Sequence, residues 1–101
     1  MKAYLVEITL SAEKDISGIY EYISLDNKAA GRRLVKEILR QIGLLERFPQ
    51  RCAVIPEAGE LDAEYRHIIY GNYRTIYRIA GHKVIIMRVV HGAMLIDKTD
   101  I

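Results

Sequence analysis

Residues 65–91 read YRHIIYGNYRTIYRIAGHKVIIMRVVH, and this stretch decides the fold. Three runs rich in Ile, Val and Tyr, at residues 65–70, 73–80 and 83–91, are separated by the pairs Gly71-Asn72 and Gly81-His82. β-branched and aromatic residues favour strands, and a two-residue connection that contains glycine is typical of a tight β-hairpin. The sequence therefore predicts a three-stranded antiparallel meander in this half of the chain.

The meander has two faces, because successive side chains of a strand point to opposite sides. We assign one face to the core, and it carries Ile68, Thr75, Tyr77, Ile79, Val84 and Ile86. The opposite face carries Ile69, Arg74, Ile76, Arg78, Ile85, Met87, Val89 and His91. A face that mixes apolar side chains with arginines needs a cover, and we expect a partner segment to supply it. A register slip of one residue would exchange the two faces.

The first half of the chain predicts one strand and two helices. Residues 3–9 alternate in polarity, as in a half-buried strand. Ser11 is the expected N-cap of an amphipathic helix of about 14 residues that ends at Asp26-Asn27. Asn27 would cap a second helix over residues 28–47, which ends at Phe48-Pro49.

Residues 49–64 are loop-like, with a possible short edge strand at 52–55. The order of elements predicts an α+β fold of two layers: an N-terminal strand, an antiparallel helical hairpin and a C-terminal antiparallel sheet. A length of 101 residues is that of a single domain, so we expect one domain over residues 1–101.

Composition excludes several classes of protein. The single cysteine, Cys52, excludes an internal disulfide framework, and it has no CxxC partner. The histidines His67, His82 and His91 lack the spacing of metal ligands, so we expect no metal and no cofactor. No apolar run approaches the ~18 residues of a membrane span, and the N-terminus lacks a signal core. We therefore expect a cytoplasmic protein that does not use a membrane.

Charge is segregated along the chain, and the basic segments allow two interpretations. Residues 28–40 and 65–91 are basic, whereas residues 57–64 contain only acidic charges. Arg74 and Arg78 share a strand face and could bind phosphate beside a histidine, as an RNase requires. Alternatively, these arginines belong to a solvated strand face, where their stems pack on Tyr and Met, or they pair with the acids of residues 57–64. The helical bases at 32, 33, 36 and 40 are either a solvent face or a docking stripe for an acidic partner.

The motifs, taken in order, resemble the ParE toxins of the RelE/ParE superfamily. The helical half carries SAEKDI at 11–16, IYEYI at 19–23 and RFP at 47–49, and the sheet carries RHIIYGNYRTIYR at 66–78 and MRVVHGA at 87–93. The resemblance runs from about residue 4 to residue 95. It implies the toxin of a type II toxin–antitoxin pair, of the kind associated with plasmid stabilisation and growth arrest, with a cognate antitoxin as its partner.

Two activities compete within that superfamily. ParE-like members poison DNA gyrase, whereas RelE-like members cut mRNA on the ribosome. Arg74 matches the strand arginine with which RelE-like nucleases hold phosphate, but Met94 stands where ParE relatives carry arginine. The tail, residues 95–101, has no Tyr or His to serve as acid or base.

The resemblance therefore implies a gyrase inhibitor that works by binding and not by catalysis. One alternative is an mRNA endonuclease that acts on the ribosome, with Arg74, Arg78 and His91 as its catalytic residues. Another is a decayed toxin that only binds its antitoxin. We expect the partner-binding residues to be Arg32, Arg33, Lys36, Arg40, Arg66, Arg74, Arg78, Met87 and His91.

Overall fold

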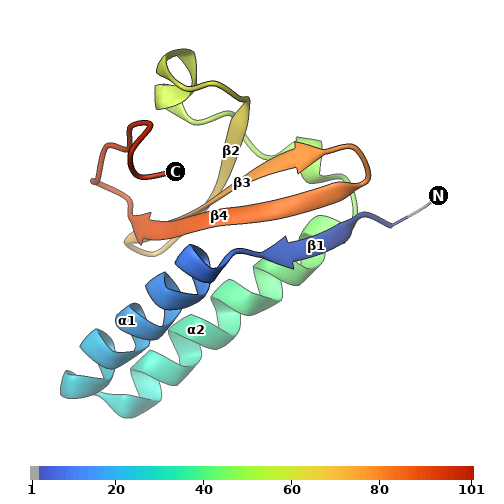
Figure 1. Cartoon of the computed structure of the whole chain (residues 1–101). Helices are drawn as coiled ribbons and strands as arrows, with labels where there is room; N and C mark the ends of the chain where they lie inside the picture. The colour runs from blue at the N-terminus through green and yellow to red at the C-terminus, as the bar shows by residue number, and fades with distance from the viewer. Residues whose placement is uncertain (1–2) are drawn as a thin grey trace.

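The computed structural model describes residues 3–101 and has the expected α+β fold (Figure 1). The elements follow the chain in the order β1 (Leu5–Ile8), α1 (Leu10–Asp26), α2 (Lys28–Gly43), β2 (Tyr65–Tyr70), β3 (Tyr73–Ala80) and β4 (Lys83–His91). The sheet order is β1-β4-β3-β2, in which β1 runs parallel to β4 and the other pairs are antiparallel. The helical hairpin covers one face of the sheet and extends beyond it.

The meander confirms the strand bounds and both turns that the sequence predicts. Gly71 and Gly81 take φ values of 57° and 61°, in the left-handed region that glycine enters without a steric cost. The two-residue turns therefore set the pairing register of β2, β3 and β4.

The helix boundaries differ from the prediction at two places. The N-cap of α1 is Thr9 and not Ser11, because the Thr9 hydroxyl accepts from the Ala12 amide and donates to the Ile86 carbonyl, 2.9 Å away. A residue that caps the helix and bonds to β4 at once is a better cap than one that only caps. Asn27 caps α2 as predicted, with its side-chain oxygen 3.0 Å from the Ala30 amide.

The α2 helix ends at Gly43 and not at residue 47. The chain tightens into a 3-10 turn at Leu44–Glu46. The Glu46 carbonyl accepts from the Tyr4 amide at 2.8 Å, so the end of the helical region is bonded to the start of the first strand. The long-range hydrogen bond thus replaces a helical one at this end.

A β-bulge in β4 corrects the assignment of faces. Ile76 pairs with Arg88 but Tyr77 pairs with Ile86, so Met87 is an extra residue. The alternation reverses after a bulge. Val89 is therefore 2% exposed in the core under the helices, and His91 lies on that same side beside Tyr73, not on the reverse face as predicted.

The main core lies between the helical hairpin and the sheet. Its buried members include the predicted Tyr77, Val84 and Ile86, and the full set is Ala12, Ile16, Ile38, Ile42, Leu45, Tyr77, Val84, Ile86 and Val89. Burial of such aliphatic side chains is the main stabilising contribution in a domain of this size.

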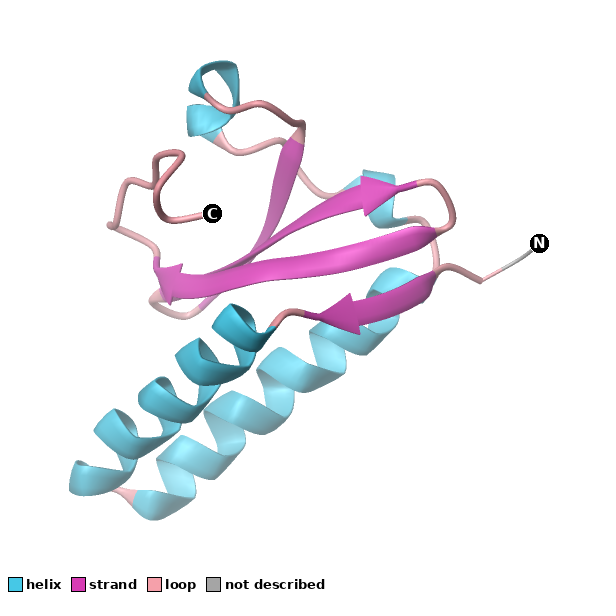
Figure 2. Cartoon of the chain, in the orientation of Figure 1, coloured by secondary structure: helices cyan, strands magenta, loops and turns pink. Residues whose placement is uncertain are grey.

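The chain itself covers much of the reverse face, which corrects the expectation of a cover supplied by a partner. Two segments lie there: the loop over residues 53–64 and the C-terminal tail over residues 94–101 (Figure 2). They contribute Ile55 and Ile96, which are buried against Ile76 and Val90 in a second apolar cluster. The edge strand expected at 52–55 is reduced to a single bridge between Val54 and Arg66.

No helix within residues 3–101 is both long enough and apolar enough to cross a membrane.

Candidate functional site

Arg74 does not face solvent, although the sequence placed it on an open face. Its side chain is 5% exposed and pairs with Glu57, which is 8% exposed. Arg74 Nη1 donates to Glu57 Oε1 at 3.1 Å, and Nη2 donates both to Glu57 and to the Met94 carbonyl. Glu57 also accepts from the Ile96 amide at 3.1 Å. One ion pair therefore joins β3, the 53–64 loop and the C-terminal tail, as the interpretation that pairs arginines with the acids of 57–64 requires.

This cluster perturbs two titratable groups. Hydrogen bonding from the Arg74 guanidinium lowers the pKa of Glu57 to about 2. Burial, and then the charge of Arg74, lowers the pKa of His67 below its usual value. The Nδ1 atom of His67 lies 3.4 Å from Arg74 Nη1. A carboxylate that stays ionised holds this arginine in place, so the guanidinium is not presented to a phosphate outside the protein.

The other members of the expected nuclease set are not gathered around Arg74. Arg78 shares the strand face but lies four residues along β3, about 13 Å away at the usual strand rise. His91 is on the opposite side of the sheet, where its Nδ1 accepts from the Ala93 amide at 3.1 Å. The described residues therefore bring Arg74 together with His67 and do not bring it together with Arg78 or His91.

Two further arginines of the sheet hold other parts of the chain. Arg66 Nη1 donates to the carbonyls of Gln50 and Cys52, at 3.1 and 2.6 Å, and Nη2 pairs with Glu64. Arg88 pairs with Asp15 of α1 at 2.7 Å. The hydrogen bonds that Arg88 donates to the Asp15 carboxylate raise the pKa of Arg88. Both guanidinium groups act as internal ties between segments that are distant in the sequence.

Met87 is another of the expected partner-binding residues. It is only partly exposed, because it packs against the apolar cluster that the loop and tail cover. The sheet thus presents few of the nine expected residues to a partner.

The α2 helix carries the largest group of exposed bases. We call this surface the basic face of α2, and it consists of Lys28, Arg32, Arg33, Lys36 and Arg40, all exposed. At 1.5 Å per residue it is about 18 Å long. Glu37 forms a bidentate pair with Arg40, and hydrogen bonding from Arg40 lowers the pKa of Glu37. The other four bases have no carboxylate within 4.0 Å among residues 3–101.

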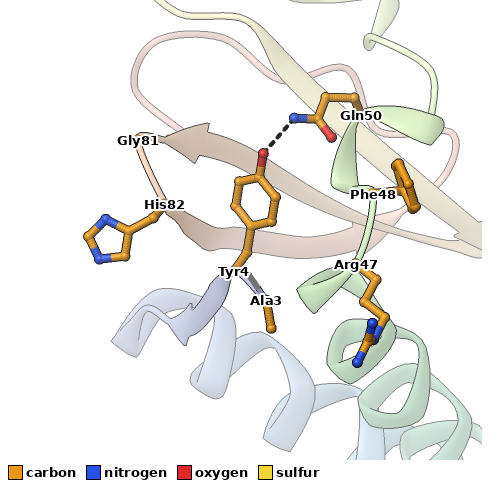
Figure 3. Close-up of a pocket in the computed structure, with 7 residues that line it drawn as sticks. All are labelled: Ala3, Tyr4, Arg47, Phe48, Gln50, Gly81 and His82. Atoms are coloured by element: carbon orange, nitrogen blue, oxygen red, sulfur yellow. Dashed lines mark hydrogen bonds between the residues drawn. The ribbon is translucent and has the colours of Figure 1, made fainter. Parts of the chain in front are cut away.

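A hollow of about 430 Å³ opens where the start of β1, the segment after α2 and the β3–β4 turn meet. Ala3, Tyr4, Arg47, Phe48, Gln50, Gly81 and His82 line it (Figure 3). Sequence reasoning did not find this site, because its residues come from three separate segments. The one signal in the sequence is Phe48-Pro49, which by itself indicates only the end of a helix.

Within residues 3–101, no group of three or more His, Cys, Asp or Glu side chains is placed to hold a metal ion.

Comparisons with known proteins place the fold and the family. A chain of the structure described as the chromosomal ParDE toxin–antitoxin system from P. aeruginosa is similar, with a TM-score of 0.72 and 21% identity over 88% of this chain and 96% of that one. A chain of the RelBE2 toxin–antitoxin complex from Mycobacterium tuberculosis has a TM-score of 0.64 and 23% identity, over 88% of this chain and 98% of that one. Among curated proteins, none matches.

The family model described as the ParE toxin of the type II toxin–antitoxin system, parDE, matches residues 6–96. That range contains all of β1 but its first residue, the helical hairpin, the whole meander and the buried Ile96. The chain therefore belongs to the ParE toxin family and is a type II toxin of the ParE/RelE kind.

Proposed function

We propose that this toxin inhibits DNA gyrase by binding it, and that a cognate antitoxin neutralises it. The observation that carries the proposal is the buried Arg74–Glu57 pair. RNA cleavage needs cationic groups and an acid–base pair positioned around a phosphate. Here the strand arginine is held by a carboxylate of the same chain, which favours a binding protein over a nuclease. The match to the ParE family supports the same choice.

The test is a supercoiling assay with purified gyrase, together with induction of the chain in growing cells. We expect growth arrest on induction and inhibition of supercoiling at micromolar concentrations of the toxin. Primer extension on translated mRNA serves as the parallel measurement. Cuts at codon positions together with an unaffected gyrase would contradict the proposal, and a lack of growth arrest would identify the chain as a decayed toxin that binds only its antitoxin.

A variant separates the two activities further. Glu57→Gln removes the negative charge that holds Arg74 while keeping the size of the side chain. If binding to gyrase is the activity, this variant gains no RNA cleavage, and its inhibition of gyrase falls only as far as its folded fraction falls. A gain of mRNA cutting would show that Arg74 is a restrained catalytic group and would contradict the proposal.

We also propose that the antitoxin lies along the helical hairpin and meets the basic face of α2 with acidic side chains. Both structural relatives were solved as parts of toxin–antitoxin systems, which supports a protein partner. Arg32, Arg33 and Lys36 are exposed on this face and form no ion pair within residues 3–101. Opposite charges of this kind raise the rate at which the toxin and the antitoxin associate more than they raise the affinity of the final complex.

A further inference from the structure

Phe48 occupies a position that suits its side chain poorly. Its φ and ψ angles are 48° and 54°, in the left-handed region that a bulky residue seldom adopts. The residue is nevertheless 60% exposed, so burial does not compensate for the backbone conformation. An asparagine or a glycine would adopt this conformation at lower cost. The ring at the rim of the hollow therefore has no explanation in folding alone.

The segment that carries Phe48 is held firmly in place. Arg51 Nη1 donates to the carbonyls of Arg47 and Phe48, at 2.7 and 3.1 Å. The buried Tyr77 hydroxyl donates to the Pro49 carbonyl at 2.6 Å. Side chains thus hold three successive carbonyls of this segment. A ligand that binds here meets a wall that is already ordered, which lowers the entropic cost of binding.

The opposite wall of the hollow is fixed in the same way. Leu5 donates its amide hydrogen to the His82 carbonyl at 2.9 Å, which joins β1 to the β3–β4 turn. Gln50 Nε2 donates to the Tyr4 hydroxyl at 2.8 Å, and Tyr4 stands between His82 and Phe48 (Figure 3). The Tyr4 hydroxyl keeps its own proton for a ligand, and the Gln50 side-chain oxygen accepts no hydrogen bond from residues 3–101.

Arg47 supplies a positive charge at this site. It forms no ion pair with a carboxylate within residues 3–101, and it is exposed beside Phe48. The backbone of Arg47 is held in place, and its guanidinium is not paired with a carboxylate of residues 3–101. Such a group is well suited to bind a phosphate. The hollow therefore combines aromatic rings, one donor and one acceptor for a planar polar edge, and a cation.

We propose that this hollow binds a nucleotide, with the base stacked on Phe48, the base edge at Tyr4 and Gln50, and the phosphate at Arg47. Aromatic side chains and arginine are the groups that proteins use for unpaired bases. The volume of about 430 Å³ lies in the range of small-ligand sites. An apolar peptide anchor would favour a closed, dry pocket, whereas this hollow is open and carries the polar groups of Tyr4, Arg47 and Gln50 beside its apolar surface. The nucleotide is either free or the end of a single strand, and the same chemistry serves both.

The site is separate from the basic face of α2, so the proposal does not depend on the target of the toxin. The test uses the ¹⁵N-labelled full chain, titrated with AMP, UMP and a short single-stranded oligonucleotide. We expect shifts of the amide resonances of Phe48, Gln50, Gly81 and His82. Adenosine alone and inorganic phosphate alone should each bind at least about tenfold more weakly than AMP. A gain in affinity with the oligonucleotide assigns the site to strand ends, and equal affinity assigns it to free nucleotides.

Three variants and a control decide the proposal. Phe48→Asn and Arg47→Gln should each weaken nucleotide binding about tenfold or more, and Phe48→Tyr should retain it. Phe48→Asn should lower the unfolding midpoint by no more than about 3 °C, because asparagine accepts the backbone conformation. Arg33→Gln, on the basic face of α2, is the control and should leave nucleotide binding unchanged.

The proposal is overturned if none of these nucleotides or the oligonucleotide shifts the four amide resonances at about 10 mM. It is also overturned if both weakening variants bind nucleotide as the unmodified chain does. Binding of an acidic aromatic peptide in the hollow, without binding of nucleotides, would assign the site to a protein partner instead.

Discussion

The Arg74–Glu57 pair is the side-chain contact on which the reverse face of the sheet depends. Both groups are more than nine-tenths buried, and each bonds to the C-terminal tail as well as to its partner. Removing one member of such a pair leaves an unpaired charge in an environment with little water. Replacing both members with apolar side chains leaves no unpaired charge, and the new side chains can pack against their apolar neighbours. The two kinds of variant should therefore behave differently.

We expect Glu57→Ala to lower the free energy of unfolding by about 3 kcal/mol. The double variant Arg74→Met with Glu57→Leu should lose less than the sum of the single changes. Glu64→Ala is the control, because Glu64 is 65% exposed and pairs with Arg66 at the surface. Urea unfolding measures all of these variants, and equal losses for Glu57→Ala and Glu64→Ala would contradict this description of the pair.

The pKa shifts in this cluster predict how stability depends on pH. The pKa of Glu57 is lowered to about 2 from 4.5, so its contribution is present above pH 4.5 and is lost as the pH falls towards 2. The loss amounts to about 3 kcal/mol. His67 adds to it, because its pKa is lowered from 6.5 and the unfolded chain takes up a proton first. The free energy of unfolding should therefore decrease as the pH falls below 6.5.

Thermal unfolding at a series of pH values tests this prediction. His67→Gln should flatten the part of the curve between pH 6.5 and 4.5, whereas the steeper loss below pH 4.5 should remain. A wild-type unfolding midpoint that stays constant between pH 6.5 and 3 would contradict it.

The two helices pack tightly where Gly31 faces Ser24. A Cβ atom added at Gly31 would lie 2.4 Å from the Ser24 hydroxyl oxygen, and that buried oxygen has no hydrogen-bond partner among residues 3–101. The hairpin therefore depends on a glycine in α2 opposite a small residue in α1. At Gly18, by contrast, an added Cβ would meet nothing within 4 Å.

We expect Gly31→Ala to destabilise the protein by about 1–3 kcal/mol through overpacking. Combining it with Ser24→Ala should recover most of that loss, since the next contact of the added Cβ is the Tyr20 carbonyl at 3.4 Å. Gly18→Ala should stabilise the protein by up to about 1 kcal/mol, because alanine favours a helix. Denaturant unfolding of the double-mutant cycle is the measurement, and additive losses from Ser24→Ala and Gly31→Ala would show that the two residues do not touch.

The C-terminal tail covers the apolar cluster on the reverse face. Two adjacent residues of this tail differ greatly in their exposure. Ile96 is 3% exposed, whereas Leu95 is 81% exposed. Ile96→Ala should cost about 2 kcal/mol of unfolding free energy, and Leu95→Ala should change it by less than about 0.5 kcal/mol. Equal effects of the two changes would mean that the tail does not pack on the sheet in solution.

The charge distribution of the whole toxin predicts how it meets its antitoxin. Triple charge reversal at Arg32, Arg33 and Lys36 should slow association about tenfold or more at low salt and remove most of its salt dependence. Lys98→Glu, on the tail, is a single-charge control to be compared with Lys36→Glu. Stopped-flow mixing measures the association rates. A rate that is unchanged by the triple substitution would show that the antitoxin does not bind at the basic face of α2.

Sequence patterning predicted the parts of this fold that depend on near neighbours. The strands and turns of the meander follow from alternation and from glycines that take positive φ, and the Asn27 cap follows from a side chain that reaches an amide three residues away. These interactions lie within a few residues, so a local pattern is sufficient to find them. The order of the motifs along the chain predicted the family.

Long-range packing decided the rest. The bulge at Met87 turns Val89 into the core, because β4 must pair with β1 and β3 while the Thr9 hydroxyl and the Asp15 carboxylate bond to it. Arg74 pairs with Glu57, which is 17 residues away in the sequence, and not with a partner molecule. The hollow at Phe48 assembles from three segments that touch only after folding. The stacking of the layers decides which distant residues are buried together. No local periodicity of the sequence specifies this packing.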